Sequence, residues 1–142
     1  MMTLTPDQTR EADEYLESQH DRFARLGKSL FDAFRHDSGR ISSQVRNLQQ
    51  IICSATRFGD IEDFVKNQMG KSGGESQKWR EVGEELLADL KRLREQAAKW
   101  TQAPEQQLAL RLKLARGWVR AVISEYLYRV ARDQMEQPHG GR

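Results

Sequence analysis

Glu17 and His20 form the first pair of residues whose types and spacing suit chemistry. They stand three positions apart, which on a helix places a carboxylate and an imidazole on one face, as in di-iron bundles. Such sites need two pairs of this kind and two further carboxylates that converge on the same metals. We do not expect that set in this chain, so we predict neither a metal site nor any other cofactor.

A second pair, Arg132 and His139, is separated by six residues and resembles the Arg…His pair of HEPN-type ribonucleases. Acid–base chemistry at a phosphate requires both groups to be held in place near the reacting atoms. His139 lies between Pro138 and Gly140, in a stretch over 137–142 that we expect to be a disordered tail. The pair therefore indicates a ribonuclease only as an alternative function.

Cys53 is the only cysteine, so no disulfide can form within the chain, and we expect a reducing, cytoplasmic location. It lies in the apolar run 51–55, and we expect a buried thiol that acts as a small hydrophobic residue. A catalytic thiolate would need a histidine partner, whereas the three histidines lie in polar surroundings. The segment 71–74 lacks the strand and the glycine pattern of a phosphate-binding loop. We therefore predict that the chain is not an enzyme.

The basic residues are more informative than any of these groups. Residues 38–58 contain three Arg and no acid, and a later run of Lys and Arg alternates with leucines. Lys113, Arg116 and Arg120 repeat at steps of three and four, so they form one ridge on a helix. Arg116 and Arg120 would lie about 6 Å apart along the axis, close to the spacing of successive phosphates. We predict RNA contacts at Arg40, Arg46, Arg57, Arg111, Lys113, Arg116 and Arg120.

Binding of this kind would be electrostatic, sensitive to salt and indifferent to nucleotide sequence. The other interpretation of such a ridge is an ordinary solvated helix face that acids on neighbouring helices balance. The net charge of only +2 leaves both interpretations open.

The elements that must position these residues are helices. The chain opens with a capping signal, Thr5-Pro6-Asp7-Gln8, and apolar residues then recur at helical spacing. An interior loop is expected at 71–78, and Pro104 separates the last two helices, which should pack as an antiparallel hairpin. The predicted helices cover 6–35, Ser42 or Ser43 to Gly59, Asp60 to Met69, 79–100 and 105–133.

Composition agrees with this organisation. The 142 residues correspond to one domain, which we place at 1–136. With 23 Lys and Arg against 21 Asp and Glu, the chain is neither a histone-like polycation nor an acidic disordered segment. Only three prolines are present and no alternating strand pattern occurs, which excludes a sandwich or barrel. The predicted fold class is an all-α, single-domain bundle of about five helices.

The termini and the apolar runs give no membrane signal. The first residues lack the basic and apolar regions of a signal peptide. The longest apolar runs are far shorter than the roughly 20 residues needed to span a bilayer. We therefore expect no membrane partner.

Two segments resemble a known family. Ser42-Ser43-Gln44-Val45-Arg46 resembles the Ser/Thr-Gln-hydrophobic-Arg opening of a helix in the small helical subunit of type III CRISPR effector complexes. Leu110-Arg111-Leu112-Lys113-Leu114, continued to Arg120, is similar to a later basic amphipathic helix of that subunit. The order of the two segments and the all-α prediction agree with this resemblance.

The resemblance implies a non-catalytic role. Copies of the subunit would stack inside a multiprotein ribonucleoprotein, and their basic faces would hold the backbone of the guide and target RNA strands. Phosphate contacts position a duplex without reading its bases, which suits a subunit that must accept any guide. The residues that the resemblance assigns to RNA are Arg46, Arg111, Lys113, Arg116 and Arg120, whereas Arg40 and Arg57 are added from charge alone.

An alternative is a helical protein-interaction or adaptor module that binds no nucleic acid. Its support is the seam of apolar residues from Trp79 to Trp100 and the aromatic residues Trp118 and Tyr128, since Trp and Tyr often anchor interfaces. Packing within the core is the other explanation of most of these residues.

Overall fold

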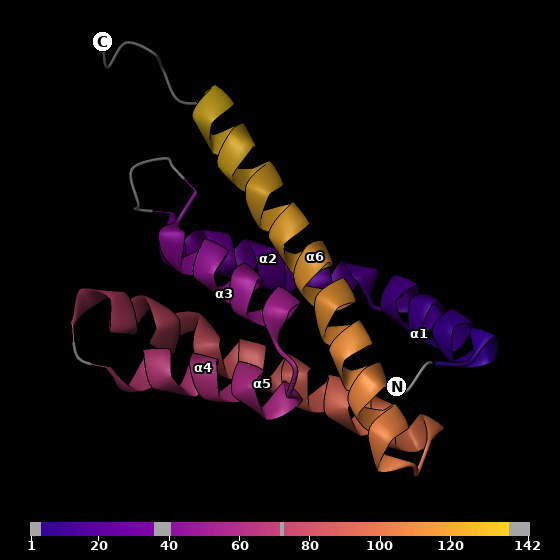
Figure 1. Ribbon diagram of the computed structural model, residues 1–142. Coiled ribbons are helices and arrows are strands. Elements are labelled where there is room, and N and C mark those ends of the chain that lie inside the picture. The colour runs from indigo at the N-terminus through magenta and orange to yellow at the C-terminus, as the bar shows by residue number, and fades with distance from the viewer. Residues whose placement is uncertain (1–3, 36–40, 72, 137–142) are drawn as a thin grey trace.

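The computed structural model describes residues 4–35, 41–71 and 73–136. Within these ranges every regular element is an α-helix and no strand is present, so the all-α prediction is confirmed. The chain forms six helices rather than about five, in one compact arrangement (Figure 1). They are α1 (Pro6–Ser18), α2 (His20–Phe34), α3 (Ser43–Ser54), α4 (Phe58–Gly70), α5 (Gly74–Trp100) and α6 (Pro104–Glu136).

The extra helix arises because the predicted helix over 6–35 is broken at Gln19. Thr5 and Gln8 form the expected reciprocal capping box at the start of α1. Gln19 then adopts φ −100° and ψ 7°, outside the α-helical region. The break falls among the six residues between Leu16 and Phe23, where Gln19 and His20 stand in place of an apolar residue. No packing side chain opposes a bend there, and α1 leaves the direction of α2 (Figure 1).

The boundary between α3 and α4 also differs from the prediction. Ser42 caps α3 as expected, since its hydroxyl accepts a hydrogen bond from the N–H of Gln44. The helix ends at Ser54, because Ala55 is extended, and Gly59 and Asp60 already belong to α4. The prediction that Asp60 caps this helix was therefore wrong. As an acid in the first turn, Asp60 complements the helix dipole from inside the helix.

The interior loop is shorter than the predicted 71–78. Gly73 has φ 113°, a left-handed conformation that favours glycine, and α5 begins at Gly74. The side chain of Arg80 donates to the carbonyl oxygens of Met69 (2.9 Å) and Lys71 (2.8 Å). These two bonds fasten the end of α4 to the first turns of α5, so most of the segment is ordered. The last helix likewise extends beyond the predicted 105–133.

Helix α6 is the centre of the bundle, and it packs against each of the other five helices. Trp79, the first residue of the predicted seam, and Trp118 are completely buried. The ring of Trp79 meets Phe34 and Phe64 edge to face, at centroid distances of 5.4 and 5.7 Å. These two tryptophans are core residues, so of the proposed aromatic anchors only Tyr128 is strongly exposed.

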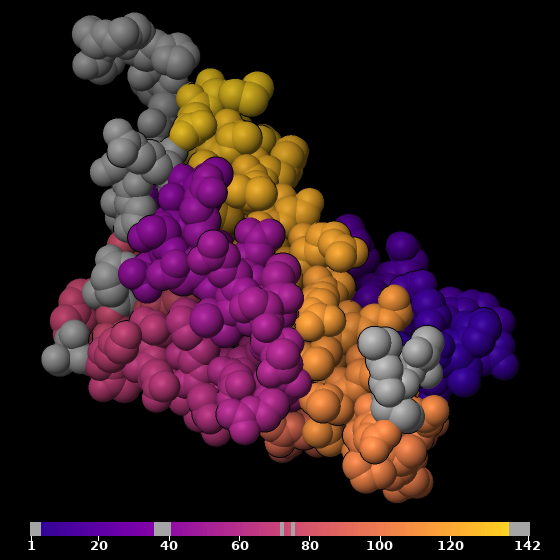
Figure 2. Space-filling view, in the orientation of Figure 1, coloured from indigo at the N-terminus to yellow at the C-terminus, as the bar shows by residue number. Residues whose placement is uncertain are grey.

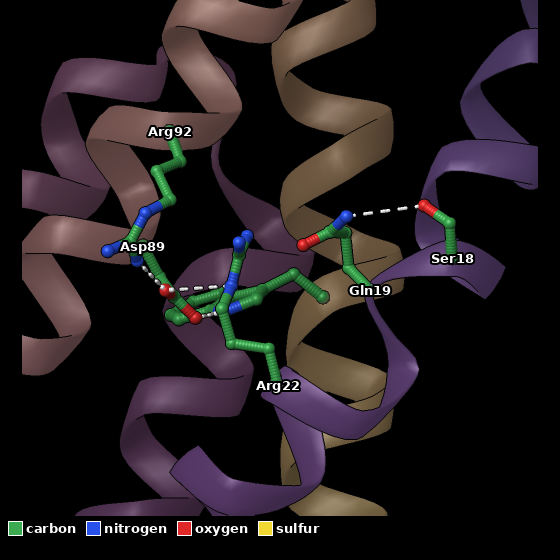
Figure 3. A network of polar contacts seen from close by, with 6 residues as sticks. Ser18, Gln19, Arg22, Asp89 and Arg92 are labelled. Carbon is green, nitrogen blue, oxygen red and sulfur yellow. Dashed lines mark hydrogen bonds and ion pairs between the residues drawn. The ribbon is translucent and has the colours of Figure 1, made fainter.

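A buried carboxylate at the edge of the core joins three helices. Asp89 of α5 is 3% exposed, and its Oδ2 accepts a hydrogen bond from the indole Nε1 of Trp118 on α6 at 3.0 Å. Its Oδ1 lies 2.6 Å from Nη1 of Arg92 and 3.5 Å from Nε of Arg22 on α2. Figure 3 shows both arginines reaching the same carboxylate from two different helices. A buried charge with such partners is satisfied, but its removal leaves the partners without a counter-ion.

Replacement of Asp89 tests this network. Asp89→Leu leaves the buried indole N–H of Trp118 without an acceptor, so we expect the free energy of unfolding to fall by about 3 kcal/mol. Asp89→Asn keeps an acceptor for Trp118 but loses the charge, and we expect about half that loss. The measurement is urea unfolding followed by circular dichroism. Asp32→Asn, which breaks the exposed Lys28–Asp32 pair, is the control and should cost less than about 1 kcal/mol. Equal losses for Asp89→Leu and Asp32→Asn would contradict the network's role.

The crossing of α2 and α6 depends on Gly27. A Cβ added there would lie 2.6 Å from the carbonyl oxygen of Val122 and 2.6 Å from Cβ of Glu125. Since a backbone carbonyl cannot move aside as a side chain can, we expect Gly27→Ala to lower the free energy of unfolding by about 1–3 kcal/mol. In Gly83→Ala the atoms nearest to the new methyl group belong to the flexible side chain of Met69, which can move aside, so this control should change stability by less than about 1 kcal/mol. A Gly27→Ala variant as stable as Gly83→Ala would refute the tight crossing.

Candidate nucleic-acid interface

The predicted RNA-contacting residues do not share one surface. Arg40 lies outside the residues that the structure describes. Arg57 is exposed at the start of α4, where its guanidinium lies 3.4 Å from the carboxylate of Asp60. Arg46 is exposed on α3, and the remaining four residues point in different directions from α6.

Arg111 faces the interior side of α6. Its Nη2 donates to Gln107 at 3.3 Å, while its Nε is buried without a hydrogen-bond partner. Burial, and then the nearby charge of Arg94, lower the pKa of Arg111 from its ordinary value. Arg94 in turn is paired with Glu62 of α4. Arg111 is therefore oriented toward α4 and α5 rather than toward a ligand on the open face.

Lys113 secures α1. Its Nζ lies 3.2 Å from Oδ1 of Asp13, and its side chain is 30% exposed. Close by, Leu16 packs against Gly117, and Gln8 donates to Gln106 at 3.2 Å. The charge of Lys113 is thus matched by an acid of α1, and it adds little to a positive surface.

Arg116 and Arg120 are the exposed pair on α6. They stand one turn apart, about 6 Å along the axis, on the same face. Nη2 of Arg116 donates to the carbonyl oxygen of Ala55 at 3.0 Å, directly after the end of α3. This bond orients the guanidinium at the boundary between α3 and α6 and leaves its other N–H groups for a further acceptor.

Arg46 of α3 lies at the same boundary, beside a later part of α6. It lines a hollow of about 600 Å³ with Ile41, Leu127 and Val130, among others. Leu127 stands seven residues, or nearly two turns, after Arg120 and therefore on the same face of α6. Arg116, Arg120 and Arg46 thus follow one another along the junction of the two helices. We call these three residues the α3–α6 strip, and Figure 2 shows the surfaces of the two helices meeting along one side of the molecule.

Acids are absent from the helix segments that carry the strip. The sequence of α3 contains no Asp or Glu, and neither does the stretch 106–124 of α6. Helix α1, by contrast, carries five acids and a single Arg. Helix α1 and the strip therefore carry opposite charge, although the chain as a whole carries a net charge of only +2.

Cys53 is exposed, which corrects the prediction of a buried thiol. The buried residues of α3 are Val45, Leu48 and Ile52, and Cys53 lies one step of about 100° from Ile52, on the solvent side. The apolar run that surrounds it in the sequence did not distinguish these two faces. Cys53 stands seven residues after Arg46 and so shares its face of α3.

Tyr128 and Arg132, which the sequence patterns assigned to two different alternative functions, lie together near the end of α6. Tyr128 is 54% exposed, with the guanidinium of Arg132 5.8 Å from its ring centre. Nη2 of Arg132 donates to Glu136 at 2.8 Å. This hydrogen bond raises the pKa of Arg132 above its ordinary value, and the interaction with Tyr128 raises it to a smaller extent. The repeat at steps of four from Arg116 through Arg120 and Ser124 to Tyr128 was the sequence signal that places Tyr128 next to the predicted arginines. His139, the other member of the predicted ribonuclease pair, lies outside the described residues.

Neither a metal cluster nor a membrane-spanning helix occurs in the described part of the chain. Among residues 4–35, 41–71 and 73–136, no group of three or more His, Cys, Asp or Glu side chains is placed to hold a metal ion. In the same ranges no helix has both the length and the apolar character required to cross a bilayer.

Comparison with known proteins adds no relative. No family model, curated protein or solved structure matches the chain. The candidate site therefore rests on the geometry and charge of the residues described above.

The exposure of Cys53 is directly testable. In the native protein we expect Cys53 to react with a small thiol reagent at a rate of the same order as in the unfolded chain, because no side chain covers it. The control carries Cys53→Ser with Ile52→Cys, which moves the only thiol to a fully buried position. That thiol should be protected until the protein unfolds. Equal protection of both thiols would place Cys53 inside the core.

Proposed function

We propose that this chain is a non-catalytic RNA-binding subunit that holds an RNA backbone through the α3–α6 strip. The observation that carries the proposal is the alignment of Arg116, Arg120 and Arg46 along two helix segments without an acid. The strip would contact phosphates and leave base edges unread, so binding is indifferent to sequence.

The geometry of Arg116 suits such a role. One N–H group donates to the carbonyl of Ala55, which fixes the plane of the guanidinium before a ligand arrives. A guanidinium that is already oriented loses less conformational freedom when it binds a phosphate than a free side chain does. Arg120 then meets the next phosphate along the strand, since one helical turn advances about as far as one nucleotide.

The identity of the larger assembly follows from the sequence resemblance. Arg46 and Arg120 stand at the ends of the two segments that resemble the small subunit of type III CRISPR effector complexes. The proposed partners are accordingly a guide and a target RNA strand, the other subunits of the effector, and further copies of this chain. The separation of the acidic α1 from the basic strip supports stacking, because the acidic side chains of one copy can face the arginines of the next.

An adaptor without nucleic acid is the second candidate. Its support is a group of large apolar side chains exposed near the end of α6, namely Leu127, Tyr128 and Met135. Exposed aromatic and Met side chains are frequent at protein interfaces. This function requires a stoichiometric protein complex that survives nuclease treatment and does not depend on Arg116 or Arg120.

Charge reversal on the strip tests the proposed function. Arg116→Glu with Arg120→Glu removes two cations that hold phosphates, so we expect RNA affinity to fall by about tenfold or more at low salt. The slope of log affinity against log salt should fall by about 2, which is one for each phosphate that is no longer held. The measurement is fluorescence anisotropy of an RNA duplex of about 20 base pairs, titrated between about 50 and 200 mM salt. A dye on Cys53, which shares the face of Arg46, gives a second signal from the protein.

The matched control is Arg25→Glu with Lys91→Glu. Arg25 lies on α2 and Lys91 on α5, and both are exposed and outside the strip. This control variant has the same net charge as the strip variant. It should lose much less affinity than the strip variant, and circular dichroism should show the same helicity for both. Equal losses would show that overall charge rather than the strip binds RNA. No RNA binding by the wild-type chain at low salt, alone or within its native complex, would reject the function.

A further inference from the structure

The exposed row of α6 continues beyond the α3–α6 strip. Residues 116, 120, 124, 128 and 132 follow one another at steps of four, and all five are exposed. On an α-helix such residues form one slowly turning ridge. The ridge leads from Arg116 and Arg120, past the small side chain of Ser124, to Tyr128 and Arg132. A strand held at Arg120 would reach Tyr128 after about 12 Å along the axis.

Tyr128 borders a hollow at the end of this ridge. The hollow has a volume of about 280 Å³ and lies between the end of α2 and the last turns of α6. Aromatic rings from both helices line it, since Phe31 and Tyr128 each contribute one. Arginines accompany both rings: Arg35 lies 5.2 Å from the ring centre of Phe31, and Arg132 lies 5.8 Å from that of Tyr128.

The charges around the hollow are balanced, unlike those of the strip. Three guanidinium groups are matched by carboxylates: Arg129 pairs with Glu125 at 2.8 Å, Arg132 with Glu136 at 2.8 Å, and Arg35 with Asp133 at 3.6 Å. A phosphate would therefore find no net positive charge in the hollow. A neutral, planar group with both donors and acceptors on its edge would find partners for each, together with an exposed ring on which to stack.

We propose that Tyr128 stacks an unpaired base of the RNA strand whose phosphates lie on Arg116 and Arg120. The inference rests on the proposed function and extends it from duplex backbone to a single-stranded segment beside the duplex. A base inside a duplex is already stacked on both sides, so only an unpaired base can enter the hollow. Stacking on a tyrosine ring accepts any of the four bases, which keeps the site compatible with RNA of any sequence.

The test compares three RNA probes of one sequence. The first is a blunt duplex, the second carries a short single-stranded overhang, and the third carries an overhang of abasic residues, with phosphates but no bases. Wild-type protein should bind the base-containing overhang about fivefold or more tightly than the abasic one, as expected when one base stacks on an aromatic ring. Tyr128→Ala should abolish this difference and leave binding of the blunt duplex unchanged. Tyr128→Phe keeps the ring and should retain the difference.

The two proposals fail in distinguishable ways. Equal wild-type affinity for the base-containing and abasic overhangs would overturn the stacking site, while the salt-dependent loss in the Arg116→Glu, Arg120→Glu variant would still support the function. A Tyr128→Ala variant that retains the full preference for bases would also overturn the site. If this substitution instead dissociates a protein complex, as seen by sedimentation, while the preference for bases persists, then Tyr128 is a protein contact and the inference is wrong.

Discussion

The orientation of α6 about its own axis depends on the hydrogen bond between Trp118 and the buried carboxylate of Asp89. A helix turns about 100° per residue, so the side chains two positions before and two after Trp118 point roughly away from it. Those side chains are Arg116 and Arg120. With the indole directed into the core toward α5, both guanidinium groups lie on the opposite side of α6, where the two residues are exposed.

From Arg116 onward, the exposed residues of α6 include one row at steps of four. Buried residues occur on several sides of this helix, because the other five helices all pack against it. The row at 116, 120, 124, 128 and 132 is left open along much of the helix. Arginines on this row are therefore close to solvent, whereas Arg111, only five residues earlier, is directed toward α4 and α5 and loses part of its hydration. A central helix thus separates exposed from structural basic residues by rotation alone.

Local signals in the sequence identified much of the fold. The capping box at Thr5 and Gln8 and the cap at Ser42 follow from hydrogen bonds within a few residues, and such bonds can be read from neighbouring letters. The break at Gln19 could not be found in this way, because the apolar spacing from Leu16 to Phe23 still fits one continuous helix. The end of α3 at Ser54 was missed for a related reason, since Gly59 is a stronger local stop signal than Ala55.

From the sequence it was possible to predict a row of basic residues on one helix face, but not which of the predicted residues belong to the candidate site. Spacing within one helix placed Arg116 and Arg120 on a common face, and this holds in the structure. Whether Lys113 is matched by an acid depends on where α1 lies, and the position of Arg46 beside Leu127 depends on how α3 packs against α6. Both are contacts between segments far apart in the sequence, which periodicity does not report.

The crossing at Gly27 has a consequence for how this chain can diverge. Most surface positions, including the acidic residues of α1, can be substituted one at a time, because the chain still folds after each substitution. At Gly27 the carbonyl of Val122 stands where any other side chain would begin, so no single-step replacement preserves the spacing of α2 and α6. Lineages that share this architecture should therefore keep a glycine at this crossing while exposed positions elsewhere change.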